Sequence, residues 1–316
     1  MLVFLTSVRH PHNSASYQKV ESLLARTLNS ICSQTDQNFH VVVVCNQIPD
    51  FQAHYPKVDF VQVDFPPPST EKTPKIEATG VKKDKGTKRL VGLLRAAQYS
   101  PEHIMFFDAD DLLSNRIAEF VNARPNEHGW VVQDGYVYGD GMSLLMPKKD
   151  FHLGCGSSII LNYSLLKTLL KLPPDFPPNP SQEMILEKVD SYFLHRVLGD
   201  HSRVKGYFQE TGYPLSSMPF PAAIWVVNTG ENRSVDKGIS GILGQPITPE
   251  VSREFTIEHR TVALPDLMEI LMRLPKAVWI SFRLLVFRDL KNSLYRRLSS
   301  KLWFKQLRGK MRDEVR

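Results

Sequence analysis

The chain has 316 residues, of which 42% are hydrophobic and 23% are charged. This composition is close to the globular average, which excludes a globally disordered chain, and the length is sufficient to bury a substantial core. The formal net charge of +6 is uneven: residues 266–316 hold 13 Lys/Arg against 5 Asp/Glu, a net +8, so residues 1–265 carry −2. A basic tail on a near-neutral body argues against a nucleic-acid binder and favours docking onto an anionic surface.

The cysteines and the N-terminus indicate the cell compartment. Cys32, Cys45 and Cys155 are widely separated and form no CxxC pair. This spacing excludes a disulfide framework and a zinc site, and it favours a reducing compartment. The apolar start of MLVFLTSVRHPH is too short for a signal peptide or a membrane span, and it is better explained as a first β-strand. We therefore expect a cytoplasmic protein.

Short apolar runs alternate with longer amphipathic stretches over the first two hundred residues, which is typical of βαβ units and a largely parallel sheet. The β-branched run HVVVVCN suits a central strand that is buried on both faces. Prolines exclude regular structure from FPPPSTEKTP, which we expect to be a surface loop. The pattern predicts strands at 3–8, 40–46, 59–65 and 104–107, and helices at 17–34, capped by Ser14 or Ser16, and near 85–99.

The second half of the body has a weaker pattern. A proline-rich loop at 172–181 precedes a strongly patterned helix, SQEMILEKVDSYFLHRVL. Residues 236–263 show little periodicity, and the final fifty residues resume helical spacing. The pattern predicts a helix near 114–123, a strand at 130–139 and a helix at 181–198.

An acidic run follows the predicted strand at 104–107. Asp108, Asp110 and Asp111 lie within four residues, and burying their charge near an apolar strand is costly unless a cation or hydrogen-bond donors compensate. In open α/β sheets, ligands bind beyond the carboxyl ends of the strands. A hard divalent ion, Mg²⁺ or Mn²⁺, is the natural partner of such oxygen ligands together with phosphate. The alternative is a simple strand-to-helix turn in which Asp111 caps the helix and Asp108 is solvated.

With these motifs in place, the chain resembles the inverting nucleotide-sugar glycosyltransferases of the GT-A fold, family two in the usual sequence classification. The resemblance covers residues 1 to about 235 and rests on the order of VFLTSV, LLARTLNSICSQ, HVVVVCN, FFDADDLL, CGSSI and EKVDSYFLHRVL. It implies an α/β GT-A catalytic domain over 1–235, and we expect a connecting segment at 236–265 and an amphipathic basic helical tail at 266–316. The implied reaction transfers a sugar from a nucleotide diphosphate-sugar, most simply a UDP-sugar, to a hydroxyl acceptor with inversion.

The resemblance also implies residue roles on the donor side. Asp108 would contact the ribose or the metal, and Asp110 would ligate the metal that bridges the diphosphate, with Asp111 supporting them. DKGTKR would present a basic turn to the donor, although an exposed helix start has the same composition. Many family members have Asp near the position of Asn46, so this chain departs from the family pattern there. The implied nucleotide-sugar contacts are Thr6, Arg9, Asn46, Lys85, Arg89, Asp108, Cys155, Gly156, Asn232 and Arg233.

Inversion needs a base that takes the proton of the acceptor hydroxyl. The family places this role on the Asp of a Glu-Asp pair, and the matching residue here is Asp190, although Val189 stands where Glu is usual. Glu187, one turn earlier on the predicted helix, is the second candidate. The alternative for Asp190 is an exposed helical residue without a catalytic role.

The tail shows apolar residues at helical spacing in two segments that Pro275 separates. Its most apolar stretch, AVWISFRLLVF, has 11 residues and contains Arg283, so it falls short of the ~20 residues of a spanning helix. Trp279, Phe282, Trp303 and Phe304 among many Lys/Arg are typical of a helix that lies on anionic lipid. We expect peripheral membrane association, which suits a glycan or lipid-linked acceptor; the alternative is a tail that packs on the body or on another subunit.

Two other functions were compared with this prediction. A phosphotransferase could use FFDADD as a nucleophilic Asp with a metal, but that chemistry usually places its DxD after the first strand, and here three strands precede it. A noncatalytic membrane-docking protein could keep the same fold. The sequence has no GxxxxGK[ST], GxGxxG or HExxH, which argues against the common kinase, dehydrogenase and metalloprotease classes.

Overall fold

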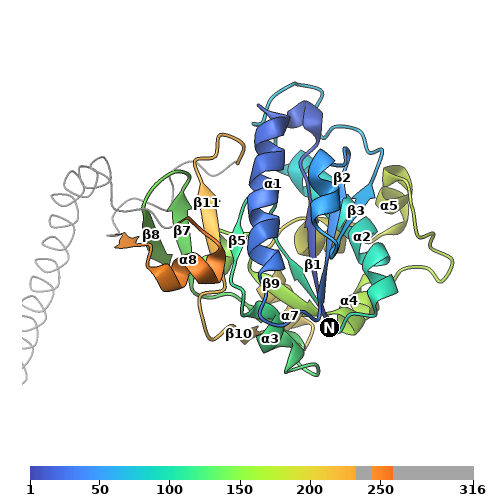
Figure 1. The fold of residues 1–316 in the computed structure, drawn as a ribbon. Coiled ribbons are helices and arrows are strands. Elements are labelled where there is room, and N and C mark those ends of the chain that lie inside the picture. Colours follow the sequence, from blue (N-terminus) through green and yellow to red (C-terminus); the bar gives the residue numbers. More distant parts are fainter. Residues whose placement is uncertain (233–243, 259–316) are drawn as a thin grey trace, which may run out of the picture. The chain divides into compact units, whose positions relative to one another are not determined.

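The main sheet has seven strands in the order β10-β6-β9-β4-β1-β2-β3. Its strands β1, β2 and β3 lie side by side in the ribbon (Figure 1). The computed structural model describes residues 1–232 and 244–258. Within this part, β9 runs antiparallel to its neighbours β4 and β6, and the other strands of the sheet share one direction. The strand bounds are β1 Leu2–Ser7, β2 Phe39–Cys45, β3 Val58–Gln62, β4 His103–Phe106, β6 Gly129–Val131, β9 Ile159–Asn162 and β10 Ser216–Ser217.

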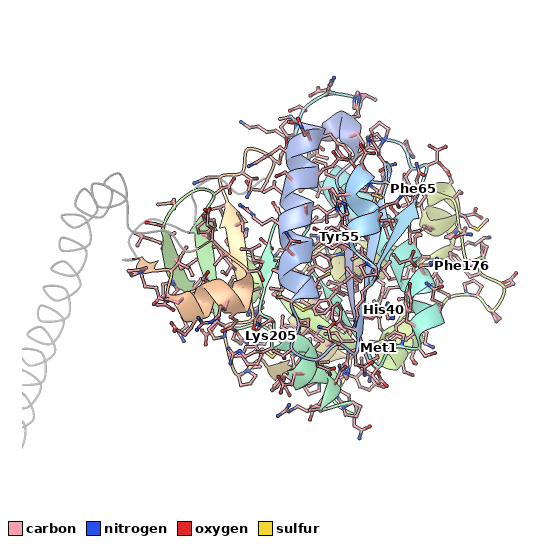
Figure 2. All side chains as sticks on the ribbon, viewed as in Figure 1. Met1, His40, Tyr55, Phe65, Phe176 and Lys205 are labelled. Carbon is pink, nitrogen blue, oxygen red and sulfur yellow. The ribbon has the colours of Figure 1, made fainter. Side chains whose placement is uncertain are left out.

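Helices cover both faces of this sheet because successive residues of each strand point to opposite sides. Phe4 and Val41 pack in one core with α1 (Tyr17–Cys32), while Leu5 and Val42 pack in a second core with α2 (Ala78–Ala96). Side chains fill the space between these layers (Figure 2). The predicted class, α/β with a mainly parallel sheet flanked by helices, is therefore confirmed.

The N-terminal elements agree with the sequence prediction within a few residues. Strands predicted at 3–8, 40–46, 59–65 and 104–107 are β1, β2, β3 and β4. Ser16 caps α1, since its hydroxyl accepts a hydrogen bond from the Lys19 N–H at 3.3 Å. The proline-rich segment after β3 has no regular structure, as expected.

Helix α2 begins at Ala78, which corrects the prediction of a helix that starts near residue 85. DKGTKR is thus part of the helix and not a turn, and most of its side chains are buried. Gly86 had suggested the turn, but its missing side chain serves packing, because a Cβ there would meet the carbonyl oxygen of Leu194.

A second, five-stranded sheet has the order β12-β8-β7-β11-β5. The single strand predicted at 130–139 is wrong: the segment forms β6 in the main sheet and β7 in the second sheet. The chain leaves the first sheet after Val131, and Gly135 admits the Phe151 ring against the backbone where β7 starts. The bounds are β5 Leu112–Leu113, β7 Gly135–Gly139, β8 Leu144–Lys148, β11 Ala223–Val227 and β12 Gln245–Pro246.

The helix predicted at 181–198 is also wrong, because it divides into three pieces: α5 (Gln182–Lys188), α6 (Ser191–Phe193) and a π-helix, η5 (Leu194–Leu198). Buried Val189 is extended, and the Asp190 carboxylate accepts a hydrogen bond from the Phe193 N–H at 2.7 Å. Such a cap begins a new helix and ends the old one.

The remaining helices are α3 Ile117–Asn122, α4 Tyr163–Leu170, α7 Val204–Glu210 and α8 Pro249–Phe255. No helix in the described ranges is long and apolar enough to cross a membrane. Arg233 and the predicted tail at 266–316 lie outside the described residues.

Candidate active site

A cavity lies at the carboxyl ends of β1 and β4, where the open-sheet rule places ligands. Five segments supply its walls: the turn after β1, one side of α1, the proline-rich loop before α2, the first half of α2 and the acidic run after β4. A sixth segment, after β11, reaches the same cavity. The lining residues are Ser7, Val8, Arg9, His10, Val20, Leu23, Pro68, Ile76, Val81, Asp84, Lys85, Asp108, Ala109, Asp110, Glu231 and Asn232.

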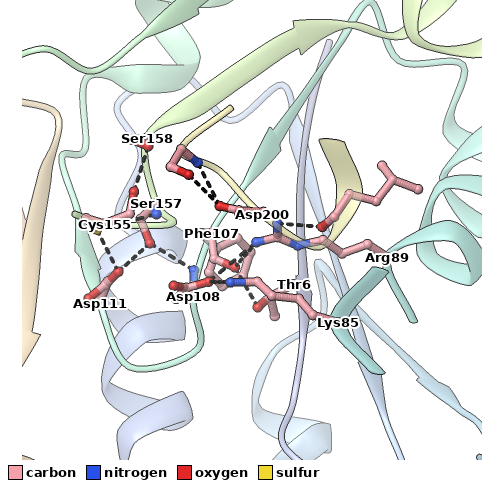
Figure 3. A network of polar contacts seen from close by, with 12 residues as sticks. Thr6, Lys85, Arg89, Phe107, Asp108, Asp111, Cys155, Ser157, Ser158 and Asp200 are labelled. Atoms are coloured by element: carbon pink, nitrogen blue, oxygen red, sulfur yellow. Dashed lines mark hydrogen bonds and ion pairs between the residues drawn. The ribbon is translucent and has the colours of Figure 1, made fainter. Parts of the chain in front are cut away.

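Asp108 lies at the centre of a polar network (Figure 3). Its carboxylate forms ion pairs with Lys85 and, at 3.4 Å, with the Arg89 guanidinium. Its backbone N–H donates to the Ser157 hydroxyl at 2.8 Å. Burial alone would raise the pKa of Asp108, but the two cations hold it below its usual range. Asp108 therefore stays ionised.

Arg89 holds the end of β4 in place. It is 1% exposed and donates to the carbonyl oxygens of Leu198 at 3.0 Å and Phe107 at 3.3 Å. Burial lowers the pKa of Arg89 to about 10, so it remains a cation at neutral pH. Thr6 is fully buried and donates to the same Phe107 carbonyl at 2.8 Å. Arg89 and Thr6 thus hold the strand end that presents Asp108.

Asp110 and Asp111 have different surroundings. Asp110 lines the cavity, and burial together with the charge of Asp108 raises the pKa of Asp110 to about 6. Asp111 is 1% exposed and accepts hydrogen bonds from the Ser157 hydroxyl at 2.6 Å and the Val226 N–H at 3.1 Å. Burial and the neighbouring carboxylates raise the pKa of Asp111 well above its usual value. Asp111 therefore fastens the acidic turn to β11.

Asp108 and Asp110 are carboxylates at the cavity that could hold a metal ion. The described residues contain no group of three or more His, Cys, Asp or Glu that could hold a metal by itself. Protein sites for Mg²⁺ commonly supply only one or two carboxylates, and substrate phosphates and water complete the coordination. Burial and then the charge of Asp108 raise the pKa of Asp110, and a bound cation would oppose both effects. Asp108 and Asp110 fit a divalent ion that binds together with a phosphate ligand.

Several predicted donor contacts lie at the cavity. Arg9 lines it and pairs with Glu231 at 3.1 Å, and Asn232 lines it while its amide donates to the Val226 carbonyl at 2.8 Å. A Cβ on Gly156 would meet the Asp108 carboxylate, so the predicted close backbone approach occurs here between two parts of the chain. Cys155 is 1% exposed and donates its thiol proton to Asp111.

Other predicted residues lie elsewhere. Asn46 donates to the carbonyl oxygens of Val63 at 3.2 Å and Phe65 at 2.9 Å, and it is not among the described residues that line the cavity. Asp190 is exposed and caps α6, and the Glu187 side chain is 70% exposed. Because the chain bends at Val189, these two carboxylates do not share a helical face as predicted.

Asp200 and His201 were not among the predicted site residues. Asp200 pairs with Lys82 at 2.6 Å and accepts hydrogen bonds from the Ser202 N–H at 3.0 Å and hydroxyl at 2.8 Å. Burial opposes ionisation, but these contacts lower the pKa of Asp200 to about 2. Arg89 binds both Leu198 and Asp108, which brings this loop beside the acidic run (Figure 3). The Asp-x-Ser spacing of an Asx turn was the available signal in the sequence.

His201 faces the same group of charges. Burial, followed by the charge of Lys85, lowers the pKa of His201 to about 4, although Asp108 and Asp200 oppose this. The imidazole is therefore neutral at physiological pH. Glu231 was likewise not predicted: it is 5% exposed and accepts hydrogen bonds from the N–H groups of Ala15 at 3.2 Å and Ser16 at 2.6 Å.

Comparisons with known proteins give limited similarity. No protein-family model matches the chain, and a comparison with curated proteins also gives no match. Among solved structures, TarS 1-349 from S. aureus aligns at 14% identity with a TM-score of 0.40, covering 71% of this chain and 60% of that chain. A complex of the same protein with UDP aligns at 15% identity with a TM-score of 0.40, covering 72% of this chain and 61% of that chain.

A mannosyltransferase, PcManGT from Pyrobaculum calidifontis in complex with GDP-Man and Mn²⁺, aligns at 13% identity with a TM-score of 0.38. That alignment covers 87% of this chain and 68% of the mannosyltransferase. The chain thus spans about 60% of the length of the two TarS structures. Since all three TM-scores are below 0.5, the fold described above rests on strand order and register alone.

Proposed function

We propose that this chain is a GT-A-type glycosyltransferase that moves a sugar from a nucleotide diphosphate-sugar to a hydroxyl acceptor. One observation carries the proposal: a single cavity at the carboxyl ends of β1 and β4 combines an apolar part with a charged part. Val20, Leu23 and Ile76 suit a flat nucleobase, and the charged part suits a diphosphate. A UDP-sugar and inversion at the anomeric carbon are the expectations from the sequence, and they are part of the proposal.

The charged part would bind the diphosphate in two ways. Lys85 and Arg9 supply positive charge at the cavity wall. Asp108 and Asp110 would hold Mn²⁺ or Mg²⁺, which supplies further positive charge to the diphosphate as it leaves. Arg89, Thr6 and Ser157 keep Asp108 in place through the contacts described above. This preorganisation lowers the free-energy cost of forming the site when the donor binds.

Transfer requires a carboxylate that accepts the proton of the acceptor hydroxyl. As the acceptor oxygen bonds to the anomeric carbon, the bond from that carbon to the diphosphate oxygen breaks, and the diphosphate keeps the electron pair. Asp190 was the candidate from the sequence, and its exposed position leaves it open to an acceptor. We favour Asp200, because Arg89 ties its loop to Asp108 at the site.

The basic tail would place the enzyme on a membrane. Residues 266–316 carry a net charge of +8 and several aromatic side chains. Such a segment binds anionic lipid, and it would suit a lipid-linked or glycan acceptor at the membrane surface. A cytoplasmic and peripheral location is part of this proposal.

A turnover assay tests the proposed function. The full chain is incubated with Mn²⁺ and a panel of UDP-sugars and GDP-sugars, and release of UDP or GDP is measured. We expect metal-dependent release from at least one donor, with a loss of at least 100-fold in Asp110→Asn. Asp200→Asn should lose activity with donor affinity unchanged, whereas Asp190→Asn should retain activity. The reverse pattern would assign the base to Asp190, and no release from any donor would contradict the proposed reaction.

A phosphotransferase with Asp108 as nucleophile receives no support from the geometry. The Asp108 carboxylate is paired with Lys85 and Arg89 within a network of buried side chains.

A further inference from the structure

A buried ion pair lies in the wall of the cavity, and the functions described so far do not use it. Asp84 and Lys88 are one turn apart on α2, with exposed fractions of 7% and 0%. The Lys88 Nζ atom lies 2.9 Å from each carboxylate oxygen of Asp84. It also donates to the Val8 carbonyl at 3.0 Å, at the end of β1. The pair thus fixes the Asp84 carboxylate against the turn after β1.

One oxygen of this carboxylate is ion-paired but accepts no directional hydrogen bond. The Lys88 ammonium donates to Oδ2 and lies 2.9 Å from Oδ1, which is buried and has no hydrogen-bond donor aligned with it within the described part of the chain. Asp84 is also one of the residues that line the cavity. A carboxylate oxygen can accept more than one hydrogen bond, so a ligand that brings an N–H group to Oδ1 would form a charge-assisted hydrogen bond.

The neighbours of Asp84 define the kind of group that reaches it. Val8, Val20, Leu23, Ile76 and Val81 form the apolar part of the same cavity. A planar ring can enter such a space, while the diphosphate extends toward Lys85 and Asp110. Asn46, the residue expected to contact the base, is instead held between the carbonyls of Val63 and Phe65.

We propose that Asp84 determines which nucleobase the site accepts. Uracil presents N3–H and guanine presents N1–H and its amino group, and each can donate to Asp84 Oδ1. Cytosine and adenine present an unprotonated ring nitrogen at the equivalent edge, which repels a carboxylate. The site therefore selects uridine or guanosine diphosphates over cytidine and adenosine diphosphates. This inference rests on the proposed nucleotide-sugar function, and it names the chemistry by which the donor is recognised.

Lys88 is a positioning residue in this account. Its fully buried ammonium contacts both oxygens of Asp84 and the Val8 carbonyl, and so fixes the orientation of the carboxylate in the cavity wall. Removing Asp84 alone would leave the Lys88 charge buried without its carboxylate partner and would destabilise the folded protein. A variant that removes both charges is therefore the better test.

Calorimetric titration of the full wild-type chain with UDP, GDP, CDP and ADP in the presence of Mn²⁺ tests the selection. We expect UDP or GDP to bind at least tenfold more tightly than CDP and ADP. Methylation of the preferred base at its ring N–H, giving N3-methyl-UDP or N1-methyl-GDP, should weaken binding at least tenfold. Equal binding of all four nucleotides, tighter binding of CDP or ADP, or an unchanged affinity for the methylated form would overturn the inference.

The double variant Asp84→Asn with Lys88→Met supplies the second arm. It should still bind UDP but discriminate against CDP by less than threefold, whereas Asp50→Asn, an exposed acidic residue in η2 (Asp50–His54), should keep the wild-type ratio. Retained discrimination in the double variant would refute the role of Asp84. If the variant does not fold, the affinity of wild-type protein for the methylated nucleotide tests the role of Asp84 instead. If wild-type protein binds no nucleoside diphosphate, the proposed function itself fails and this inference fails with it.

Discussion

Asp108, Asp110 and Asp111 are consecutive in the sequence apart from one alanine, yet each carboxylate has its own neighbours. Asp108 forms ion pairs with Lys85 and Arg89, Asp110 faces the cavity, and Asp111 is buried against β11. Ligand binding and folding are therefore assigned to different members of one short run. Substitutions within the run should separate the two effects.

Asp111→Ala should lower the free energy of unfolding by about 2–3 kcal/mol, because the Ser157 hydroxyl and the Val226 N–H would lose their acceptor in a buried place. Asp110→Ala should leave stability unchanged or raise it by up to about 1 kcal/mol, because folding raises the pKa of Asp110 and an ionised group of that kind is destabilising. Urea unfolding at pH 7 measures both. Equal losses in the two variants would contradict this division.

His201 gives stability a dependence on pH. Its pKa is about 4 in the folded protein against 6.5 for an unperturbed histidine, so the unfolded chain binds the proton first as the pH falls. The neutral imidazole thus contributes stability above pH 6.5 that is lost between pH 6.5 and 4. The charged groups that act on His201 are Lys85, Arg89, Asp108 and Asp200.

When the pH falls from 7 to 4.5, the free energy of unfolding of the wild-type protein should accordingly decrease by about 2 kcal/mol more than that of His201→Gln. Urea unfolding of both proteins at the two pH values supplies the comparison. Parallel losses in wild type and variant would show that His201 is protonated equally in the folded and unfolded chains.

At the scale of elements, the packing of α2 against η5 holds the loop of Asp200 at the site. Gly86 lets the Leu194 carbonyl approach the helix, and Arg89 then reaches the Leu198 carbonyl from the next turn. An alanine in a helix usually stabilises by about 1 kcal/mol relative to glycine. At Gly86 this gain is outweighed, because the added methyl group would overlap the backbone of Leu194.

Gly86→Ala should therefore lower the free energy of unfolding by about 1–3 kcal/mol and weaken nucleotide binding. Gly206 in α7 is the matched control, since a Cβ there meets no atom within 4 Å. Gly206→Ala should stabilise the protein by about 0.5–1 kcal/mol. Thermal unfolding of the two variants checks the contrast, and a stabilised Gly86→Ala would refute the close packing of α2 and η5.

The elements with a clear hydrophobic period could be predicted from the sequence. The valine run of β2 and the capped, amphipathic α1 have one reasonable interpretation each. The helix predicted at 181–198 failed because a buried valine in extended conformation continues the apolar pattern while the backbone turns at Asp190. The single strand predicted at 130–139 is wrong for a similar reason, since apolar alternation does not show that a chain passes from one sheet to another.

The site could be predicted where residues follow a strand, and not where they depend on packing. Asp108 and Asp110 follow β4 directly, and Arg9 follows β1, so their positions are consequences of the sheet. Asp84 and Glu231 reach the same cavity from a helix that began earlier than expected and from a turn after β11. The positions of Asp84 and Glu231 in the sequence do not indicate that the two side chains line the same cavity.

At the scale of the whole molecule, the uneven charge predicts a membrane-binding activity separate from the nucleotide binding proposed for the body of the chain. Full-length protein should bind vesicles that contain phosphatidylserine and should not bind vesicles of phosphatidylcholine alone. Replacing Arg288, Lys291, Arg296, Arg297, Lys301 and Lys305 by Gln should reduce that binding at least tenfold, since each basic residue contributes about 1 kcal/mol near an anionic surface. Cosedimentation measures the bound fraction, with nucleotide binding as the control for an intact body. Vesicle binding that survives the six substitutions would argue against the tail as the anchor.

The central claim is that Asp108 and Asp110 form a metal-assisted site for a nucleoside diphosphate. Calorimetric titration of the full chain with UDP and with GDP, in Mn²⁺ and in EDTA, tests it most directly, with Asp110→Asn as the variant. We predict binding in Mn²⁺ that weakens at least 30-fold in EDTA and by a similar factor in Asp110→Asn. The same affinity in wild type and Asp110→Asn, with or without the metal, would contradict the claim.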